Sequence, residues 1–363
     1  MKRLFLILLL IVLAGTLIFN GCAEPAPAPA PAPGPTPAPP PAPPKVYELK
    51  IQSAWPRGDL SMETLTAFAD AADKRSNGQL KISVFGAPDI VGMFEVAEAV
   101  KKGTLDMGHG AGNLWSGIIP VGDVEFGLPY GYRIPEEKTF EGKGNAIRKF
   151  FFESGFIDLL REQYATQGVY YLDIHPYGPV PFMVATKPIK TVGDFKGLRI
   201  RTDGLWMEWE NGCGANGVDI SGDEGYMALK MGTVDAGIWD VSCVTGLSWH
   251  EVAPYWIHGE ENDDAIGHII VNQGLWNGLP DNLKQALAGA AEDYWYACLA
   301  AYEKDMAACY DLVKQGKFTE VSMDDDLIKL HEQVGYALWD EVASRDAAAA
   351  KAVGMIKAWR GVK

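Results

Sequence analysis

Beyond residue 45 the chain alternates between two hydrophobic patterns. Apolar residues in short runs or in alternation with polar ones predict strands, and apolar residues every three or four positions predict amphipathic helices. Strands are predicted at 46–55, 79–86 and 104–110, with helices at 61–78 and 93–103 between them. This order is typical of a mostly parallel, doubly wound sheet. The sequence therefore predicts an α/β fold.

The same pattern returns later in the chain. AVKKGTLDMG at 99–108 matches ALKMGTVDAG at 228–237 in its Ala, Lys, Gly, Thr, Asp and final Gly, and LKIQS at 49–53 resembles LRIRT at 198–202. In both copies a helix ends in Lys-x-Gly-Thr, where glycine suits the position just past a helix C-terminus. Two matches in the same order favour two similar lobes over chance recurrence of a common helix–turn–strand unit.

Residues 281–315 contain no proline and only one glycine, and they predict a single long helix. At 1.5 Å per residue it would extend about 50 Å, enough to brace both lobes. A short strand at 318–323 and two further helices are expected after it. We expect discontinuous lobes, with 46–175 and 267–306 in lobe I and 176–266 and 307–363 in lobe II. The ligand cleft is expected between them.

The first 45 residues have a different character. Lys2 and Arg3 precede an apolar run at 4–19, which has the length of a secretory signal, and Cys22 follows a glycine as in a bacterial lipoprotein cleavage site. Residues 23–45 are rich in Pro and Ala and predict an extended polyproline tether. We therefore expect residues 1–22 to be a lipoprotein-type signal peptide, although a simple secretory signal and an uncleaved anchor remain open alternatives.

The charge and cysteine content of the chain limit the kinds of partner and cross-link that are expected. The 363 residues carry a net charge of −15, with no basic stripe, so nucleic acid is not an expected partner. Cys298 and Cys309 lie too far apart on one predicted helix to bond each other. Cys213 and Cys243 are able to pair in an oxidising compartment, and buried free thiols are an equally open alternative.

Two arginines occupy the predicted strand at 198–202. In an open α/β sheet, ligands bind beyond the carboxyl ends of the strands, and there Arg201 is expected. A guanidinium grips a carboxylate through paired hydrogen bonds and stays charged. Arg199 lies nearer the strand's beginning, where an arginine usually reaches a rim or a structural carboxylate. The alternative for Arg201 is a structural ion pair.

Other strand exits carry aromatic and polar residues. Each tryptophan alone would most simply be core, but together, at equivalent strand ends, they favour a pocket for a small organic acid. The candidate ligand-binding residues are Arg201, Trp55, His109, Asn113, Trp115, Tyr177, Trp239 and Asp240.

From Val46 onward the chain resembles the substrate-binding proteins of tripartite ATP-independent periplasmic (TRAP) transporters, of the C4-dicarboxylate-binding type. The resemblance is carried by GLRIRTDG, ALKMGTVDAGIWD, GTLDMGHGAGNLWSG, VAPYW and WNGLPDNLKQAL. It implies a two-lobed, periplasmic-binding-protein-like receptor that closes on a carboxylate and delivers it to a membrane permease. It also implies that Arg201, the second basic residue of its motif, pairs with the ligand.

The segments GHGAGNLW and VAPYW look closest to the branch of this family that binds 2-oxo acids or hydroxy acids. Members of that branch can hold a cation through a glutamate just before the tryptophan that Trp239 matches, but this chain has Ile238 there. An uncharged branched side chain cannot supply that ligand, so neither a metal nor another cofactor is expected.

An enzyme is the serious alternative class: a secreted, lipid-anchored protein acting on a small carboxylic acid. The sequence contains no G-x-S-x-G or H-E-x-x-H motif, and GHGAG lacks the frame of a dinucleotide-binding loop. His250 and His258 are the one loosely spaced histidine pair, and they are interpreted as surface or packing residues. No catalytic residue is predicted. A surface adhesin would explain the tether but not the repeated lobes.

Overall fold

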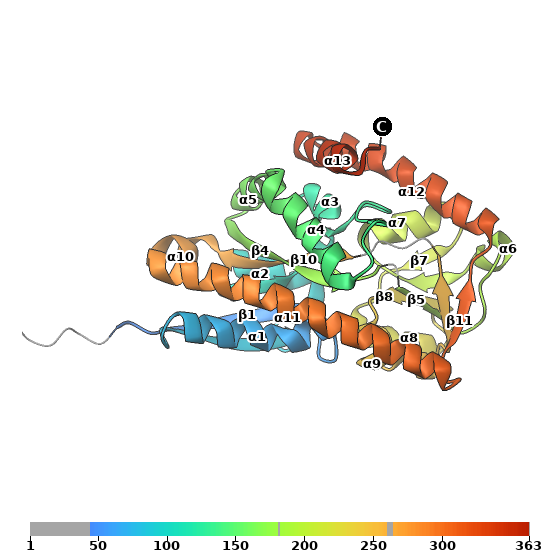
Figure 1. Cartoon of the computed structure of the whole chain (residues 1–363), viewed down its shortest axis with the longest axis horizontal. Coiled ribbons are helices and arrows are strands. Elements are labelled where there is room, and N and C mark those ends of the chain that lie inside the picture. Colours follow the sequence, from blue (N-terminus) through green and yellow to red (C-terminus); the bar gives the residue numbers. More distant parts are fainter. Residues whose placement is uncertain (1–43, 181, 260–263, 363) are drawn as a thin grey trace, which may run out of the picture. The chain divides into compact units, whose positions relative to one another are not determined.

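The computed structural model describes residues 44–180, 182–259 and 264–362 (Figure 1). The predicted signal segment, Cys22 and most of the predicted tether lie outside these residues. Pro44–Lys363 form one compact unit. None of the described helices has the length and apolar character of a membrane span.

The first sheet has five strands in the order β2-β1-β3-β10-β4. β2, β1 and β3 are parallel, and β10 is antiparallel to β3 and to β4. The bounds are β1 (Tyr47–Pro56), β2 (Leu80–Ala87), β3 (Met107–Gly110), β4 (Val169–Gly178) and β10 (Ala265–Asn272).

The second sheet has six strands in the order β11-β9-β5-β8-β6-β7. Only β5 runs against its neighbours here, as β10 does in the first sheet. The bounds are β5 (Phe182–Ala185), β6 (Arg199–Arg201), β7 (Asn216–Val218), β8 (Ala236–Trp239), β9 (Tyr255–His258) and β11 (Thr319–Ser322).

The two reversed strands mark where the chain passes between the sheets. β5 is the first strand after β4, and β10 is the first after β9, so each arrives from the other sheet. The sheets are therefore mixed, and the prediction of mostly parallel sheets holds for β2-β1-β3 and for β7-β6-β8. The predicted lobe boundaries, at 175/176, 266/267 and 306/307, fall inside β4, β10 and the helix α11 (Asp281–Lys314), and they stay a prediction.

The helices and 3₁₀ turns connect these strands. The bounds are α1 (Leu60–Arg75), η1 (Met93–Glu95), α2 (Val96–Lys101), η2 (Gly112–Trp115), α3 (Val121–Phe126), α4 (Phe140–Glu153), α5 (Phe156–Ala165), α6 (Val192–Phe195), α7 (Gly204–Gly212), η3 (Gly222–Glu224), α8 (Gly225–Lys230), α9 (Ser242–Thr245), η4 (Trp249–Glu251), α10 (Gln273–Gly278), α11 (Asp281–Lys314), α12 (Asp325–Arg345) and α13 (Ala347–Arg360). The helix predicted at 93–103 is divided into η1 and α2.

The repeated sequence forms the same structure twice. α2 leads to β3 and α8 leads to β8, and the threonine N–H of each Gly-Thr bonds the helix carbonyl five residues back, at 2.9 Å in both copies. Asp106 Oδ2 accepts from the backbone N–H of Lys50 at 2.8 Å, and Asp235 Oδ2 accepts from that of Arg199 at 3.0 Å. The aspartate thus ties each second strand to the strand beside it.

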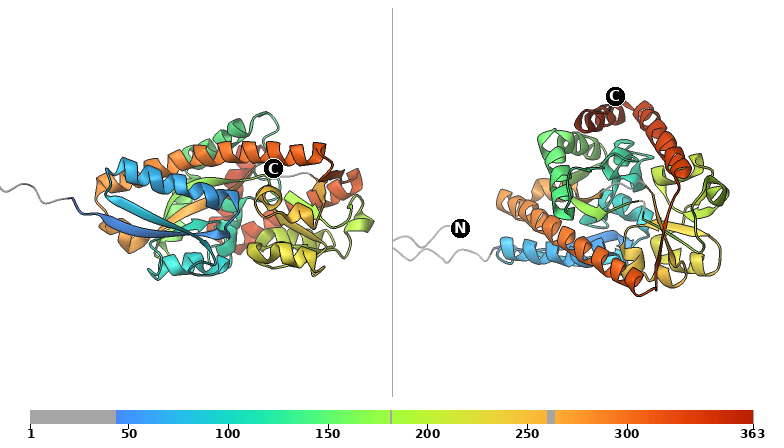
Figure 2. Two further views of the ribbon diagram at one scale, coloured as in Figure 1. Left: turned by 90° about the horizontal axis from the view of Figure 1, so that it is seen from below. Right: turned by 45° about the vertical axis from the view of Figure 1, so that its right-hand side comes forward.

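α11 packs against both parts of the fold. It contacts α1 and β4 of the first sheet and α9 of the second, and it is the long orange helix of Figures 1 and 2. Near its middle, the Tyr294 hydroxyl donates to the Ser61 carbonyl at 2.7 Å. Further on, Asp305 accepts from the Thr245 hydroxyl. The predicted bracing helix is present with bounds within a residue of those expected.

The first of the two C-terminal helices begins at the acidic run MDDD, residues 323–326. Asp324 caps α12 by accepting from the Leu327 N–H at 2.9 Å. α12 contacts α6 and α7, whereas α13 packs on α3 and α5. Arg345, at the end of α12, bonds the buried Asp123 of α3.

Candidate functional site

Arg201 is the last residue of β6 and is 1% exposed. Its Nε donates to the Ile220 carbonyl at 2.7 Å and its Nη1 to the Ile238 carbonyl at 2.9 Å. The guanidinium lies 4.5 Å from the ring centre of Trp239, within cation–π range. Its remaining nitrogen, Nη2, has no hydrogen bond to any described residue. The fork is fixed on two sides, with one donor left over.

Asp203 lies beside that donor. Its Oδ2 is 3.2 Å from Arg201 Nη2, and its Oδ1 accepts from Asn113 Nδ2 at 2.8 Å. Asn113 belongs to η2, which follows β3 of the first sheet, whereas Asp203 follows β6 of the second. The contact therefore joins the carboxyl ends of strands from both sheets.

Aromatic rings surround this pair. Trp55 packs against Tyr177 with ring centres 4.8 Å apart and meets Trp239 edge-on at 5.8 Å. Phe126 lies 5.7 Å from Tyr177 and 6.1 Å from Trp206. Burial raises the pKa of Tyr177 well above its usual range, so its hydroxyl is neutral.

These residues line one pocket. The empty space among their atoms, part of it open to solvent, is about 300 Å³. Its lining is Trp55, Asn113, Phe126, Tyr177, Val180, Arg201, Thr202, Asp203, Trp206, Ile238 and Trp239.

The structure brings five of the eight predicted residues to this pocket: Trp55, Asn113, Tyr177, Arg201 and Trp239. The other three, His109, Trp115 and Asp240, are not in its lining. The sequence reasoning missed Phe126, Thr202, Asp203 and Trp206. The segment GLRIRTDG did hold a signal for Asp203, because Asp203 lies two residues beyond Arg201, the last residue of the strand.

His109 lies behind the pocket, inside β3 rather than beyond its end. Its Nδ1 is 2.9 Å from Ser53 Oγ, and its Nε2 is 3.0 Å from the Tyr294 hydroxyl of α11. Burial, with His175 stacked 4.1 Å away, lowers the pKa of His109 well below its usual range. Trp115 stacks on Tyr164. Trp115 and His109 line a second pocket, separate from the one at Arg201, with about 250 Å³ of empty space that includes open solvent.

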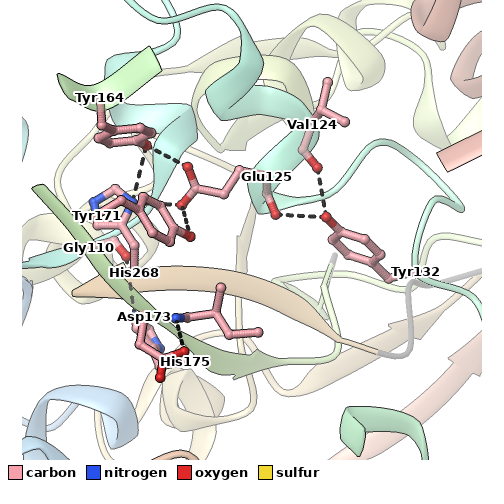
Figure 3. Close-up of polar contacts among 10 residues, drawn as sticks. Gly110, Val124, Glu125, Tyr132, Tyr164, Tyr171, Asp173, His175 and His268 are labelled. Carbon is pink, nitrogen blue, oxygen red and sulfur yellow. Dashed lines mark hydrogen bonds and ion pairs between the residues drawn. The ribbon is translucent and has the colours of Figure 1, made fainter. Parts of the chain in front are cut away.

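A buried carboxylate supports the pocket from the first sheet. Glu125 accepts from the Tyr164 hydroxyl at 2.5 Å and the Tyr171 hydroxyl at 3.2 Å, and it contacts His268 Nδ1 at 2.7 Å (Figure 3). A Cβ on Gly112 would stand 2.5 Å from Glu125 Oε2, so only glycine fits there. The Glu125 carboxylate thus packs closely against the backbone beside Asn113.

Two more buried carboxyls lie behind Trp239. Its Nε1 donates to Asp59 Oδ2 at 2.9 Å, which is a second contact between the two sheets' strand ends. Asp240 turns away from the pocket and accepts from the Tyr302 hydroxyl at 2.6 Å. Burial raises the pKa of Asp59 to about 6. Burial and the nearby Asp59 raise the pKa of Asp240 well above its usual range.

The remaining candidates have structural partners. Arg199 forms a salt bridge with Asp235 at 2.9 Å on the exposed side of β6, as its position predicted. Arg57 pairs with Asp89 at 2.6 Å at the surface. Cys213 and Cys243 are buried free thiols, so the open alternative of a disulfide between them is not realised.

The donor chemistry does not indicate a metal site. Across the described ranges, no three His, Cys, Asp or Glu side chains are grouped to hold an ion. Ile238 lines the pocket at the position where the resemblance implied a glutamate, and it offers there an apolar side chain.

Such a pocket between two α/β sheets, joined by chain crossings from β4 to β5, from β9 to β10 and from β10 to β11, defines a two-lobed solute-binding protein. Comparison with known families agrees. Residues 51–346 match the model of bacterial extracellular solute-binding protein family 7 (DctP), and the chain belongs to this family. Proteins of the family are extracytoplasmic receptors that bind solutes for transport.

The curated relatives include two binding proteins of named specificity. A monocarboxylate 2-oxoacid-binding periplasmic protein of Nostoc is 22% identical over 86% of this chain and 83% of its own. A C4-dicarboxylate-binding periplasmic protein of Rhodobacter capsulatus is 27% identical over 77% and 81%, respectively.

Solved structures share the fold. A TRAP periplasmic solute-binding protein from Pseudoalteromonas atlantica, with bound sodium and pyruvate, has a TM-score of 0.77 at 23% identity, covering 87% of this chain and 94% of its own. A marine metagenome TRAP protein in complex with pyroglutamate has a TM-score of 0.75 at 18% identity, covering 86% and 99%. Both similarities concern the fold.

Proposed function

We propose that this protein captures a small carboxylic acid in the pocket at Arg201 and delivers it to a TRAP-type membrane permease. The carboxylate binds Arg201 Nη2, and the indole N–H groups of Trp55 and Trp206 serve as further donors. The protein binds its ligand and does not transform it.

One observation carries the proposal: a buried, permanently charged fork at the pocket with two donors occupied and the third without a hydrogen bond among the described residues. Asp203 balances the charge of this fork at 3.2 Å but does not satisfy the third donor with a hydrogen bond, and a buried donor without a hydrogen bond is costly, so it indicates an external acceptor. The buried indole nitrogens of Trp55 and Trp206 also make no hydrogen bond among the described residues. The relatives named as 2-oxoacid-binding and C4-dicarboxylate-binding proteins support a carboxylate ligand.

The roles of the other candidates differ. Trp55, Asn113, Tyr177 and Trp239 contact the ligand, whereas His109, Trp115 and Asp240 act behind the contact layer by fixing it. No cofactor is part of the proposal. The two lobes close on the ligand about a hinge between them. Compaction with saturating ligand in solution scattering is the expected result.

The anchoring of the protein rests on its first residues. We propose that the chain is exported through residues 1–22 and lipidated at Cys22. The Pro/Ala-rich segment then holds the receptor outside the cytoplasm near its permease. Metabolic labelling with a fatty acid, compared between the native chain and Cys22→Ala, tests the lipid anchor, and an unlabelled native chain would refute it.

A thermal-shift panel of mono- and dicarboxylic acids, with and without calcium and sodium, tests the binding function, because a ligand of the folded state raises its melting temperature. The bound acid is then titrated against Arg201→Lys by calorimetry. Lysine keeps the charge but cannot serve both carbonyls and the ligand, and losing a charge-assisted hydrogen bond weakens binding by about 1.5–3 kcal/mol, or about 10- to 150-fold.

The matched control is Arg199→Lys, on the same strand with its salt bridge at the surface. It should leave affinity unchanged. If Arg199→Lys abolishes binding and Arg201→Lys does not, the assignment of the carboxylate contact is wrong. Turnover of a bound acid by the purified protein would exclude a pure receptor.

A further inference from the structure

The charges that line the pocket balance one another. Among the described lining residues, Arg201 and Asp203 are the ionised pair, and Tyr177 is neutral. The Asp203 carboxylate already lies 3.2 Å from Arg201 Nη2. A ligand with one carboxylate and no other charge would therefore give the enclosed site a net charge of −1. Burying such an uncompensated charge is unfavourable.

The groups around the pocket are also acidic. Asp59, a buried carboxyl whose pKa burial raises to about 6, lies behind Trp239. Among the described residues, the other near carboxyls are Asp240, which contacts Tyr302, and Asp219, at the surface. No described cation other than Arg201 lines the pocket. The field therefore disfavours simple anions and favours a ligand that brings a positive charge along with its carboxylate.

Asp203 is free to meet such a charge because it does not cap its helix. It occupies the N-cap position of α7, yet its side chain accepts no bond from that helix. The equivalent residue of the first lobe, Asp59, does cap α1, accepting from the N–H groups of Ser61 at 3.0 Å and Met62 at 3.2 Å. The same position in the two halves is thus used differently, and in the second the carboxylate lines the pocket.

Five buried polar atoms of the pocket make no hydrogen bond among the described residues, and they divide into donors and an acceptor. The donors are Trp55 Nε1, Trp206 Nε1, Thr202 Oγ1 and Arg201 Nη2, and they suit a carboxylate. The acceptor is Asn113 Oδ1, on a residue that is 5% exposed. Its orientation is settled by Asp203, because a carboxylate requires the amide nitrogen to face it, which leaves the amide oxygen for a ligand N–H.

We infer that the ligand is a zwitterion, a small amino or imino acid. Its carboxylate binds Arg201, and its protonated nitrogen bonds Asn113 Oδ1 and Asp203 among the aromatic rings. This rests on the proposed function and specifies its substrate class. The rings of Trp55, Phe126 and Trp206 offer faces that attract a cation.

Matched pairs of compounds test the charge directly. L-Alanine and isobutyrate have nearly the same shape, as do L-proline and cyclopentanecarboxylate, and the first of each pair carries a protonated nitrogen where the second carries carbon. Calorimetric titration of the native protein should show at least one zwitterion binding tenfold or more tightly than its partner. Tighter binding of the carbon compounds in both pairs would overturn the inference.

Asp203→Asn then tests whether Asp203 sets the preference for a zwitterion over an anion. Asparagine keeps the size and the N-cap preference and removes the charge, so the zwitterion-to-anion affinity ratio should fall tenfold or more. Because both compounds are titrated into the same sample, a partly unfolded fraction cancels from the ratio. Asp219→Asn is the control, an exposed aspartate that interacts electrostatically with Arg201 and Asp203 without lining the pocket. An unchanged ratio in Asp203→Asn refutes the assignment.

The two levels of proposal fail differently. If 2-oxo, hydroxy or dicarboxylic acids bind and the zwitterions do not, the zwitterion inference is wrong and the carboxylate receptor stands. If no carboxylic acid of either charge class binds, both are wrong. Binding of the zwitterion that survives in Arg201→Lys with native affinity would place its carboxylate elsewhere and also overturn the inference.

Discussion

Gly246→Ala tests whether the two lobes must meet for binding. Gly246 directly follows α9, and a Cβ there would stand 1.8 Å from the carbonyl oxygen of Gly58, in the loop that precedes α1. Gly58 has a φ of +93°, which holds that loop in a conformation open mainly to glycine. Gly246 itself has a φ of −97°, which suits alanine. The substitution therefore acts by steric contact across the lobes and not by backbone strain.

The size of the effect follows from the neighbouring contacts. Ordinary contact for a Cβ begins near 3.4 Å, so the 1.8 Å approach to Gly58 must lengthen by more than 1 Å. Two hydrogen bonds join the same strand ends, Trp239 to Asp59 at 2.9 Å and Asn113 to Asp203 at 2.8 Å. Lengthened by about 1 Å, neither remains a hydrogen bond. Losing both costs the closed form about 2–3 kcal/mol, or about 30- to 150-fold in affinity.

Calorimetry with the acid identified by the thermal-shift panel measures this loss. Gly117→Ala is the matched control, because a Cβ there meets no atom within 4 Å. The expected result is a large rise in Kd for Gly246→Ala, with little change in the melting temperature of the ligand-free protein. Native affinity in Gly246→Ala would show that the bound state does not require this contact, and the reasoning from lobe closure would be refuted.

Two further predictions concern buried groups. Because the pKa of Asp59 is raised from 3.8 to about 6, its contribution to stability is present below pH 4 and lost as the pH rises through 6. Relative to Asp59→Asn, native stability measured by urea unfolding should fall by up to about 3 kcal/mol between pH 4 and 7, and a constant difference would contradict this. Iodoacetamide should leave the buried thiols of Cys213, Cys243, Cys298 and Cys309 unmodified until urea is added, and a Cys213–Cys243 disulfide found by mass spectrometry would contradict the free thiols.

Local sequence was sufficient wherever a short-range pattern decides the structure. The Lys-x-Gly-Thr-x-Asp segments form the same helix–turn–strand twice because the glycine ends the helix and the aspartate bonds the adjacent strand within each lobe. The depth of Arg199 and Arg201 along one strand also separated a surface ion pair from a buried fork. These features depend on strand periodicity and on the position of a residue relative to a strand end.

The position of a residue near a strand end was not sufficient to predict whether its side chain lines the pocket. His109 lies inside β3, so its side chain points between Ser53 and α11, whereas Asn113 comes after the strand and reaches the pocket. Trp239 ends β8 and lines the pocket, while its neighbour Asp240 faces the opposite way toward Tyr302. A shift of one residue reverses the direction of a side chain, which a pattern of residue types does not resolve.

The sequence by itself determined the α/β class, the duplication, the long bracing helix and the arginine at the strand exit, since each depends on residues close together in the chain. Only the tertiary structure decided which strands run in reverse and which distant residues meet. Phe126, Asp203 and Trp206 reach the pocket because the chain crossings bring the ends of two sheets together, and the partners of a side chain across such an interface leave no periodic trace in the sequence.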